Sequence, residues 1–258
     1  MLRIRRERYD LIFSTSNQFS FAFQMRLKLL GARYLVDFNV VKYGTSTARL
    51  GMYDRTVDCV RHTHILESYF SALGQFNLAN INYQYELYGV EAHAAKAHSF
   101  LHALGDRYAG LVCFNYQASA ANRSIGKDDA VALCAALADR YRGHAVIVVY
   151  PPGGRQQAEA ITDSVGRRNV MTAFETANIL ELAALIRECD IVISPDTSVI
   201  HLASAYNKKV LGFYINTDNY RWFYPMCDHF RVMLSADEKI EQIDRQAALN
   251  AFEQLMAS

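Results

Sequence analysis

Asp196, Thr197 and Ser198 form the polar segment of this sequence that is best suited to bind a ligand. They follow an apolar run that is typical of a buried strand, and they precede an apolar segment with helical spacing. A helix start presents unpaired backbone N–H groups and a partial positive charge, which together suit a phosphate or a diphosphate. Aspartate and threonine also cap helices without binding any ligand. This turn therefore predicts a helix start and leaves ligand binding and simple capping as alternatives.

The segments around this turn alternate between short apolar runs and amphipathic helical patterns. We expect strands at residues 111–115, 145–149, 169–172, 190–194 and 210–214, and helices at 128–141, 156–165, 179–188, after 196 and at 238–256. The alternation predicts a mostly parallel sheet with right-handed crossovers and helices on both faces. Ligands bind such sheets outside the carboxyl ends of the strands. The expected site is therefore formed by the loops at residues 115–122, 151–155, 173–177, 195–198 and 216–224.

The first hundred residues have a weaker pattern. It predicts strands at residues 9–14 and 34–38, helices at 19–30, 64–73 and 92–104, and a loop at 40–58. Gly105 and Asp106 follow the last of these helices and are typical of a turn. We place a domain boundary there, with a partial N-terminal α/β domain at residues 1–105. Residues 106–258 then form a Rossmann-like, nucleotide-sugar-binding domain with a terminal helix.

The charge of the chain bears on its partners. A formal net charge of +1 and the lack of a long basic stripe argue against nucleic acid. Arg3, Arg5, Arg6 and Arg8 do cluster at the start of the sequence. They fit either a solvated approach to the first strand or peripheral contact with an anionic membrane surface. No apolar run approaches the ~18 residues that a membrane-spanning helix needs.

The cysteines indicate the cellular compartment, and the histidines are candidate metal ligands. The five cysteines are scattered and form no CxxC pair, which is typical of core residues in a reducing compartment and predicts a cytoplasmic protein. His98 and His102 have the i, i+4 spacing of a metal pair, with His62 and His64 nearby in sequence. No Glu or Cys completes a ligand set, so we expect surface or packing histidines and no metal.

Four further residues lie where predicted strands or turns end: Asn115, Ser119, Arg155 and Asn178. Asn115 and Ser119 come after a strand and line the cleft either as ligands of a nucleotide or simply by their position. Arg155 follows a Pro-Gly turn, where it reaches a ribose or a base or forms a solvated helix start. Asn178 has the place of an N-cap for the helix at residues 179–188. All four are candidate nucleotide-binding residues.

The block Ile193-Ser-Pro-Asp-Thr-Ser-Val-Ile-His-Leu-Ala-Ser-Ala205 resembles the hallmark of the family 9 glycosyltransferases, the lipopolysaccharide heptosyltransferases. The family pattern is a strand, then Asp-Thr/Ser-Gly-x-x-His-Leu-Ala-x-Ala, then a second strand. Residues 178–190 resemble the helix before this hallmark, and residues 8–12 resemble a strand of the family's N-terminal domain. The resemblance implies a two-domain GT-B fold, a nucleotide-sugar donor held mainly by the C-terminal domain, and metal-independent transfer with inversion at the anomeric carbon.

The resemblance also assigns roles residue by residue. Asp196 matches the acid that hydrogen-bonds the donor sugar. Thr197, Ser198 and Val199 match the turn whose backbone N–H groups hold the diphosphate. His201 matches a histidine one helical turn further on, so the imidazole is expected to face the same site.

Arg123 lies where the family usually offers a lysine to the phosphates, and its forked guanidinium suits that task. Ser198 stands where the family mostly has glycine, which changes how closely the backbone approaches the diphosphate. The family's N-terminal domain usually begins with a strand and a Gly-Asp turn that carries the proposed catalytic base. No segment of this sequence matches that turn, so the catalytic base is unassigned and the N-terminal domain is expected to be incomplete.

The sequence thus predicts a glycosyltransferase that uses no cofactor and transfers a sugar from a nucleotide-diphosphate donor, ADP-heptose by analogy. The acceptor is expected to be a lipid-linked glycan of the lipopolysaccharide type. The alternative is a non-catalytic nucleotide-sugar-binding homologue, or a partner subunit, that lacks the base. A dinucleotide oxidoreductase has no support, because no predicted strand leads into a GxGxxG turn.

Overall fold

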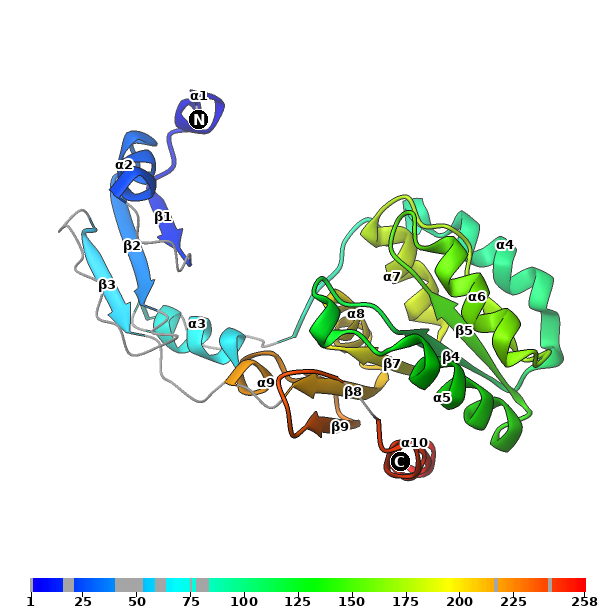
Figure 1. The fold of residues 1–258 in the computed structure, drawn as a ribbon. Helices are drawn as coiled ribbons and strands as arrows, with labels where there is room; N and C mark the ends of the chain where they lie inside the picture. Colours follow the sequence, from blue (N-terminus) through cyan, green and yellow to red (C-terminus); the bar gives the residue numbers. More distant parts are fainter. Residues whose placement is uncertain are drawn as a thin grey trace. The chain divides into compact units, whose positions relative to one another are not determined.

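The computed structural model describes residues 2–15, 21–39, 53–58, 64–74, 76–77, 84–215, 218–240 and 243–258. The chain divides into two compact units, Met1–Tyr83 and Gln84–Ser258. Each unit has its own parallel sheet (Figure 1).

The N-terminal unit contains a parallel sheet with the strand order β1-β2-β3. Its strands are β1 (Leu11–Ser14), β2 (Tyr34–Asn39) and β3 (Arg55–Asp58), and its helices are α1 (Leu2–Arg6), α2 (Phe21–Leu29) and α3 (Ile65–Gly74). Val36, Phe38 and Val57 are buried in this unit. Phe38 stacks on Phe13 of β1 and on Tyr69 of α3, with ring centroids 5.0 and 5.7 Å away. Aromatic packing therefore joins the small sheet to α3.

The C-terminal unit contains a six-stranded sheet with the order β6-β5-β4-β7-β8-β9, in which every neighbouring pair is parallel. The strands are β4 (Gly110–Asn115), β5 (His144–Val149), β6 (Val170–Thr172), β7 (Ile191–Pro195), β8 (Lys209–Ile215) and β9 (Phe230–Ser235). The helices are α4 (Ala95–Leu104), α5 (Lys127–Arg140), α6 (Arg155–Val165), α7 (Ile179–Glu188), α8 (Ser198–Ala205), α9 (Asp218–Phe223) and α10 (Arg245–Ala257). Three 3₁₀ turns complete it: η1 (Val90–His93), η2 (Gly105–Arg107) and η3 (Ala121–Arg123).

Successive side chains of a strand point to opposite faces, and here both faces are apolar. Phe114 of β4 and Ile193 of β7 belong to the core cluster that also contains residues of α5, α6 and α10. Cys113 and Val192, one position earlier, belong to the cluster that contains residues of α4, α7 and α8. The sheet is therefore covered on both faces, which explains why its strands are nearly continuous apolar runs.

The strand order creates one switch point beside β4. From β4 the chain runs outward through β5 to β6, and it then returns to place β7 on the other side of β4. Connections that leave in opposite directions open a crevice at the carboxyl ends of the two central strands. Asn115 and Pro195 end those two strands. The loops that follow β4 and β7 are thus the ones that a ligand would meet first.

The division of the chain differs from the predicted boundary between residues 105 and 106. The segment from Gln84 onward belongs to the C-terminal unit, because α4 packs on it. Ala97 of α4 is fully buried, and Phe100 lies against Phe174 with ring centroids 5.7 Å apart. Lys96 adds an ion pair with Glu181 of α7 at 2.9 Å. A sequence turn at Gly105 ends the helix without ending the unit.

Several segments differ from the expected secondary structure. The helix expected at residues 238–256 is α10, which begins only at Arg245 because Asp244 caps it there. Helix α1 was not predicted. Within the predicted loop at 40–58, residues Arg55–Asp58 form β3, while residues 40–52 lie outside the described residues. The predicted loop at 216–224 contains helix α9, and residues 216–217 lie outside the described residues. Strand β9 was not predicted, since it is an edge strand of mixed polarity. No helix in the described part of the chain is long and apolar enough to cross a membrane.

Candidate functional site

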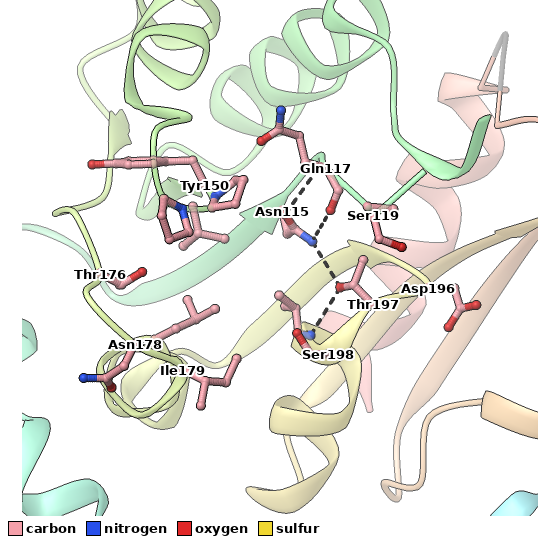
Figure 2. Close-up of a pocket in the computed structure, with 16 residues that line it drawn as sticks. Asn115, Gln117, Ser119, Tyr150, Thr176, Asn178, Ile179, Asp196, Thr197 and Ser198 are labelled. Atoms are coloured by element: carbon pink, nitrogen blue, oxygen red, sulfur yellow. Dashed lines mark hydrogen bonds between the residues drawn. The ribbon is translucent and has the colours of Figure 1, made fainter. Parts of the chain in front are cut away.

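A cavity of about 410 Å³ lies at the carboxyl ends of β4, β5 and β7, beside the switch point. Its wall is formed by the loops after these strands and by the first turns of α7 and α8 (Figure 2). The polar and small residues that line it are Asn115, Gln117, Ser119, Thr176, Asn178, Asp196, Thr197 and Ser198. Four of the loops predicted from the sequence therefore meet at one cavity.

The floor of the cavity is a hydrogen-bonded cluster that joins the ends of β4 and β7. The Asn115 amide donates to Ser194 Oγ at 3.0 Å. It also lies 3.2 Å from Thr197 Oγ1 (Figure 2). Ser194 is fully buried, and Asn115 is 5% exposed. Buried polar groups are costly unless they are paired, and here they are paired with one another. The cluster fixes the spacing between the two strand ends.

Thr197 begins α8 as its N-cap. Its Oγ1 accepts a hydrogen bond from the Val199 backbone N–H at 3.2 Å. The Asp196 backbone N–H donates to the Phe213 carbonyl of β8 at 3.1 Å, which ties the turn to the sheet. The first N–H groups of a helix have no partner inside the helix, so the start of α8 offers donors and partial positive charge at the cavity wall. The capping interpretation is confirmed, and it is compatible with anion binding.

One cation lies next to this helix start. Nη1 of Arg123 is 3.4 Å from Oδ2 of Asp196, and Nη2 donates to Ser119 Oγ at 2.7 Å. The side chains of Arg123 and Asp196 are 27% and 12% exposed. A partly exposed pair of this length is weak, so the guanidinium is available to an incoming anion at little cost.

The turn that carries Arg123 is anchored to a distant part of the chain. The preceding residue, Asn122, donates from its side chain to the Glu238 carbonyl at 3.0 Å. Its own carbonyl accepts from the Ile240 backbone N–H at 2.8 Å. Ser124 Oγ accepts from the Ala118 backbone N–H at 2.9 Å, which closes the loop from the other side. These bonds fix η3, so the guanidinium starts from a defined backbone position.

His201 does not line the cavity. Its Nδ1 lies 3.0 Å from the hydroxyl of Tyr85, and the two ring centroids are 5.3 Å apart. Phe223 approaches the imidazole edge-on at 6.2 Å. Burial lowers the pKa of His201, because the charged imidazolium loses solvent in this apolar setting. The imidazole is therefore neutral at pH 7.

The cavity also has an apolar lining. Val149, Pro151, Ile179 and Leu182 line it together with Tyr150. In Figure 2, Tyr150 and Thr176 lie on one side of the cavity, whereas Ser119 and Asp196 lie on the opposite side. Apolar and aromatic side chains suit a nucleobase, and a helix start suits phosphates. The cavity thus combines the two kinds of lining that a nucleotide requires.

Residues 2–252 match the sequence profile described as Glycosyltransferase family 9 (heptosyltransferase). This chain belongs to glycosyltransferase family 9. The predicted family is confirmed over nearly the whole sequence. No curated protein matches the chain in a sequence search.

Solved structures show the fold of this family 9 chain. A family 9 glycosyltransferase from Veillonella parvula superposes with a TM-score of 0.75 at 14% identity, over 99% of this chain and 77% of that one. The E. coli heptosyltransferase WaaC with ADP gives 0.73 at 16% identity, over 98% and 75%. The E. coli ADP-heptose lipopolysaccharide heptosyltransferase II gives 0.72 at 17%, over 99% and 78%. The predicted α/β, GT-B-like fold class with Rossmann-like parallel sheets is confirmed.

The hallmark residues of the family 9 chain differ in where they lie. Asp196, Thr197, Ser198 and Val199 all line the cavity, as the sequence pattern predicts. His201 lies one turn further along α8, but the structure turns its Nδ1 toward Tyr85. The motif spacing therefore places the helix start correctly and does not predict the partner of the histidine.

The four candidate nucleotide-binding residues differ in whether they line the cavity. Asn115 and Ser119 line the cavity. Asn178 lines it too, but its Oδ1 caps α7 by accepting from the Leu180 and Glu181 backbone N–H groups at 3.0 and 3.1 Å. Arg155 does not line the cavity and is ion-paired with Glu159 at 2.7 Å on the exposed face of α6. Of the two alternatives for Arg155, the solvated helix start fits its position.

Some lining residues were not predicted as candidates. Gln117 and Tyr150 lie in or next to loops that the strand pattern had marked, so the signal for them was positional. Ile179 and Leu182 face the cavity from α7, where an apolar residue at helical spacing is indistinguishable from a core residue. Tyr85 lies in a segment without periodicity, and no sequence signal pointed to it.

Proposed function

We propose that this chain is a glycosyltransferase that binds a nucleotide-diphosphate sugar in the cavity beside α8 and transfers the sugar to a glycan acceptor. The observation that carries the proposal is the arrangement at the charged end of the cavity. There Asp196 and the start of α8 line the cavity, and Arg123, which does not line it, is paired with Asp196. Apolar side chains such as Val149 and Leu182 line the same cavity. Family membership supports the same chemistry, since the matching profile is that of the heptosyltransferases.

In this proposal the departing nucleoside diphosphate is stabilised by fixed donors. The backbone N–H group of Ser198 faces the diphosphate, whereas that of Val199 is held by the Thr197 cap. Arg123 supplies one positive charge. Such preorganised donors act most strongly on the charge that develops in the transition state. A site with these donors needs no metal ion or other cofactor to stabilise the leaving group. Transfer with inversion at the anomeric carbon then requires a general base, and we assign none among the residues of this chain.

Asp196 is proposed to accept hydrogen bonds from hydroxyl groups of the donor sugar. Its carboxylate lies beside the phosphate-binding donors, with its side chain 12% exposed. Asn115 and Ser119 are proposed to contact the nucleotide from the end of β4. The donor is taken as ADP-heptose by analogy, because two E. coli heptosyltransferase structures similar to this chain were solved with ADP and with ADP-2-deoxy-2-fluoro heptose.

The acceptor is proposed to be a lipid-linked glycan of the lipopolysaccharide type, used at the cytoplasmic face of the inner membrane. Peripheral contact would involve α1 and the start of β1, where Arg3, Arg5 and Arg8 are exposed beside Ile4 and Tyr9. Anionic lipids attract arginine, and exposed apolar side chains insert at the headgroup level. Sedimentation with anionic vesicles tests this contact. Equal sedimentation with neutral vesicles at high salt would contradict it.

Titration of the purified chain with ADP, UDP and GDP, followed by calorimetry and melting temperature, tests the proposed donor site. A ligand that binds only the native state raises the melting temperature, by an amount that grows with its concentration over Kd. We expect ADP to bind and UDP and GDP to bind more weakly. No binding of any nucleotide would overturn the proposed site.

An activity assay distinguishes an active glycosyltransferase from a non-catalytic homologue. Product formation from ADP-heptose and a lipid-linked acceptor in the presence of EDTA would support a metal-independent enzyme. The anomeric configuration of the product reports inversion. ADP binding without turnover would favour the alternative, a non-catalytic nucleotide-sugar-binding homologue or partner subunit, in which the donor site is retained and a base is lacking.

A further inference from the structure

Tyr85 contacts the hallmark histidine from outside the hallmark. It lies in the extended segment before η1, at the start of the C-terminal unit. Its hydroxyl is 3.0 Å from Nδ1 of His201, a residue 116 positions later in the sequence. The rings are tilted by 50° with their centroids 5.3 Å apart, so packing and a hydrogen bond act on the same pair.

Both partners are uncharged at neutral pH. Burial raises the pKa of the Tyr85 phenol to about 12, so the phenol keeps its proton. Burial lowers the pKa of His201, so its imidazole carries one proton and has one nitrogen free to accept. The bond at Nδ1 therefore decides which of the two ring nitrogens holds that proton.

The chemistry of the two groups favours one direction for this bond. A phenol O–H is a good donor, and the unprotonated ring nitrogen of a neutral imidazole is a good acceptor. The reverse arrangement would use the phenol oxygen as the acceptor, although its lone pair is delocalised into the ring. We propose that Tyr85 is a positioning residue of the donor site, whose phenol donates to His201 Nδ1 and holds the imidazole in the tautomer protonated at Nε2.

The surroundings of His201 keep this arrangement in place. Phe223 closes the imidazole edge at 6.2 Å, and the carbonyl of Phe223 accepts from the Tyr214 hydroxyl at 2.9 Å. Tyr214 is itself buried, with Asp196 and Tyr85 among the groups that raise its pKa. The groups around the histidine are thus aromatic rings and phenols that hold their protons.

The tautomer limits what His201 can do in the proposed function, on which this consequence rests. Nδ1 is occupied by the phenol, and Nε2 carries the proton, so neither nitrogen offers a free lone pair. His201 lies outside the cavity lining, so it acts as a hydrogen-bond donor to a part of the donor sugar that extends beyond the cavity. It does not act as the general base that removes the acceptor proton.

Nitrogen NMR of the chain labelled with ¹⁵N-histidine tests the tautomer directly, without any ligand. His201→Gln identifies the His201 signals by their disappearance. We expect wild type to show a protonated Nε2 and an unprotonated Nδ1 at pH 7.5. A protonated Nδ1 in wild type would overturn the proposal, and His201→Gln serves only to assign the signals that are read in wild type.

Tyr85→Phe tests the hydrogen bond, because it keeps the ring and removes the hydroxyl. We expect a mixture of the two His201 tautomers in this variant. Tyr88→Phe is the matched control, since Tyr88 lies three residues away, is 78% exposed and contacts Glu86. It should leave the His201 signals unchanged. Identical His201 signals in wild type and in Tyr85→Phe would also contradict the role of Tyr85.

Binding measurements then connect the tautomer to the donor. We expect Tyr85→Phe to bind ADP-heptose about 2–10-fold more weakly than wild type, as the loss of one oriented hydrogen bond predicts. Tyr88→Phe should bind within about twofold of wild type. If wild type binds no nucleotide, the proposed function fails, whereas the tautomer result still decides the role of Tyr85. Unchanged donor affinity beside a changed tautomer would overturn the positioning role.

Discussion

Arg123 and Asp196 lie 73 residues apart in the sequence, yet Nη1 of one is 3.4 Å from Oδ2 of the other. They meet because β4 and β7 are neighbours in the sheet, and each residue lies in the loop that follows one of these strands. The pair combines a cation suited to a diphosphate with a carboxylate suited to sugar hydroxyls. The weak mutual bond leaves the guanidinium of Arg123 available to a ligand at little cost.

Replacing Arg123 by alanine should weaken ADP binding by about 10–100-fold, since a hydrogen bond to a charged group contributes about 1.5–3 kcal/mol. Isothermal titration calorimetry measures the change. Arg155→Ala is the control, because Arg155 is exposed, paired with Glu159 and away from the cavity. It should change Kd by less than about twofold. Equal losses in both variants would show a general charge effect rather than a site at Arg123.

Asp196→Asn should weaken recognition of the donor sugar without weakening the binding of the nucleotide. The variant removes a negative charge that lies next to the proposed diphosphate position, so ADP alone should bind as well as before or more tightly. ADP-heptose should lose the strong acceptor of its hydroxyl groups. We expect the preference for ADP-heptose over ADP to fall about tenfold. A competition titration measures this ratio, and an unchanged ratio would remove Asp196 from sugar recognition.

Thr197→Val should destabilise the C-terminal unit. It deletes the cap of α8 and leaves the buried Asn115 amide and Ser194 hydroxyl with fewer partners. A lost cap costs about 1 kcal/mol. The Asn115 amide keeps Gln117 and Ser194 as partners, and the Ser194 hydroxyl keeps the Pro195 carbonyl, so no buried group becomes unpaired. Urea denaturation should show a loss of about 1 kcal/mol or more. Thr197→Ser retains the hydroxyl and should remain within about 0.5 kcal/mol of wild type. If serine and valine destabilise equally, the cap is not the cause.

Stability should fall with acid in a way that depends on His201. Burial lowers its pKa in the folded state, whereas the unfolded value stays near about 6.5. Between the two pKa values the unfolded chain binds more protons, so the free energy of unfolding rises with pH in that range. Lowering the pH from about 7.5 to below 6.5 should therefore reduce the melting temperature more in wild type than in His201→Gln. Parallel curves for the two proteins would assign the acid sensitivity to other groups.

Asn122→Ala should weaken ADP binding, although Asn122 is not proposed to contact the ligand. Asn122 anchors the turn before Arg123 through Glu238, and removal of its amide frees that turn. We expect Kd to rise by about 2–10-fold, as one lost hydrogen bond predicts. Asn250→Ala is the control, since Asn250 lies on the exposed face of α10 and bonds Gln246. In an Arg123→Ala background, Asn122→Ala should have no further effect on Kd. An additive loss there would contradict positioning through Arg123.

The sequence predicted the helices and strands whose ends are marked by nearby residues, such as a capping residue or the limit of an apolar run. Asn178 was expected to cap the helix at residues 179–188, and α7 begins and ends at those residues. The strand expected at 145–149 is β5, one residue longer at its start. Strand β9 escaped prediction because an edge strand such as Phe230–Ser235 is only partly buried, so its sequence lacks the continuous apolar run of a central strand. The unit boundary was misplaced because the packing of α4 on α7 is not encoded in a nearby turn.

The sequence by itself determined the alternation of strands and helices, the start of α8 and membership of the family, since each rests on residues close together in the chain. Only the tertiary structure decided which strand ends are neighbours. The strand order places β7 beside β4, and this brings Arg123 to Asp196. The folding of the segment before η1 onto α8 brings Tyr85 to His201 across 116 residues. Contacts over such separations depend on how the whole core packs, and the local pattern of side chains does not contain that information.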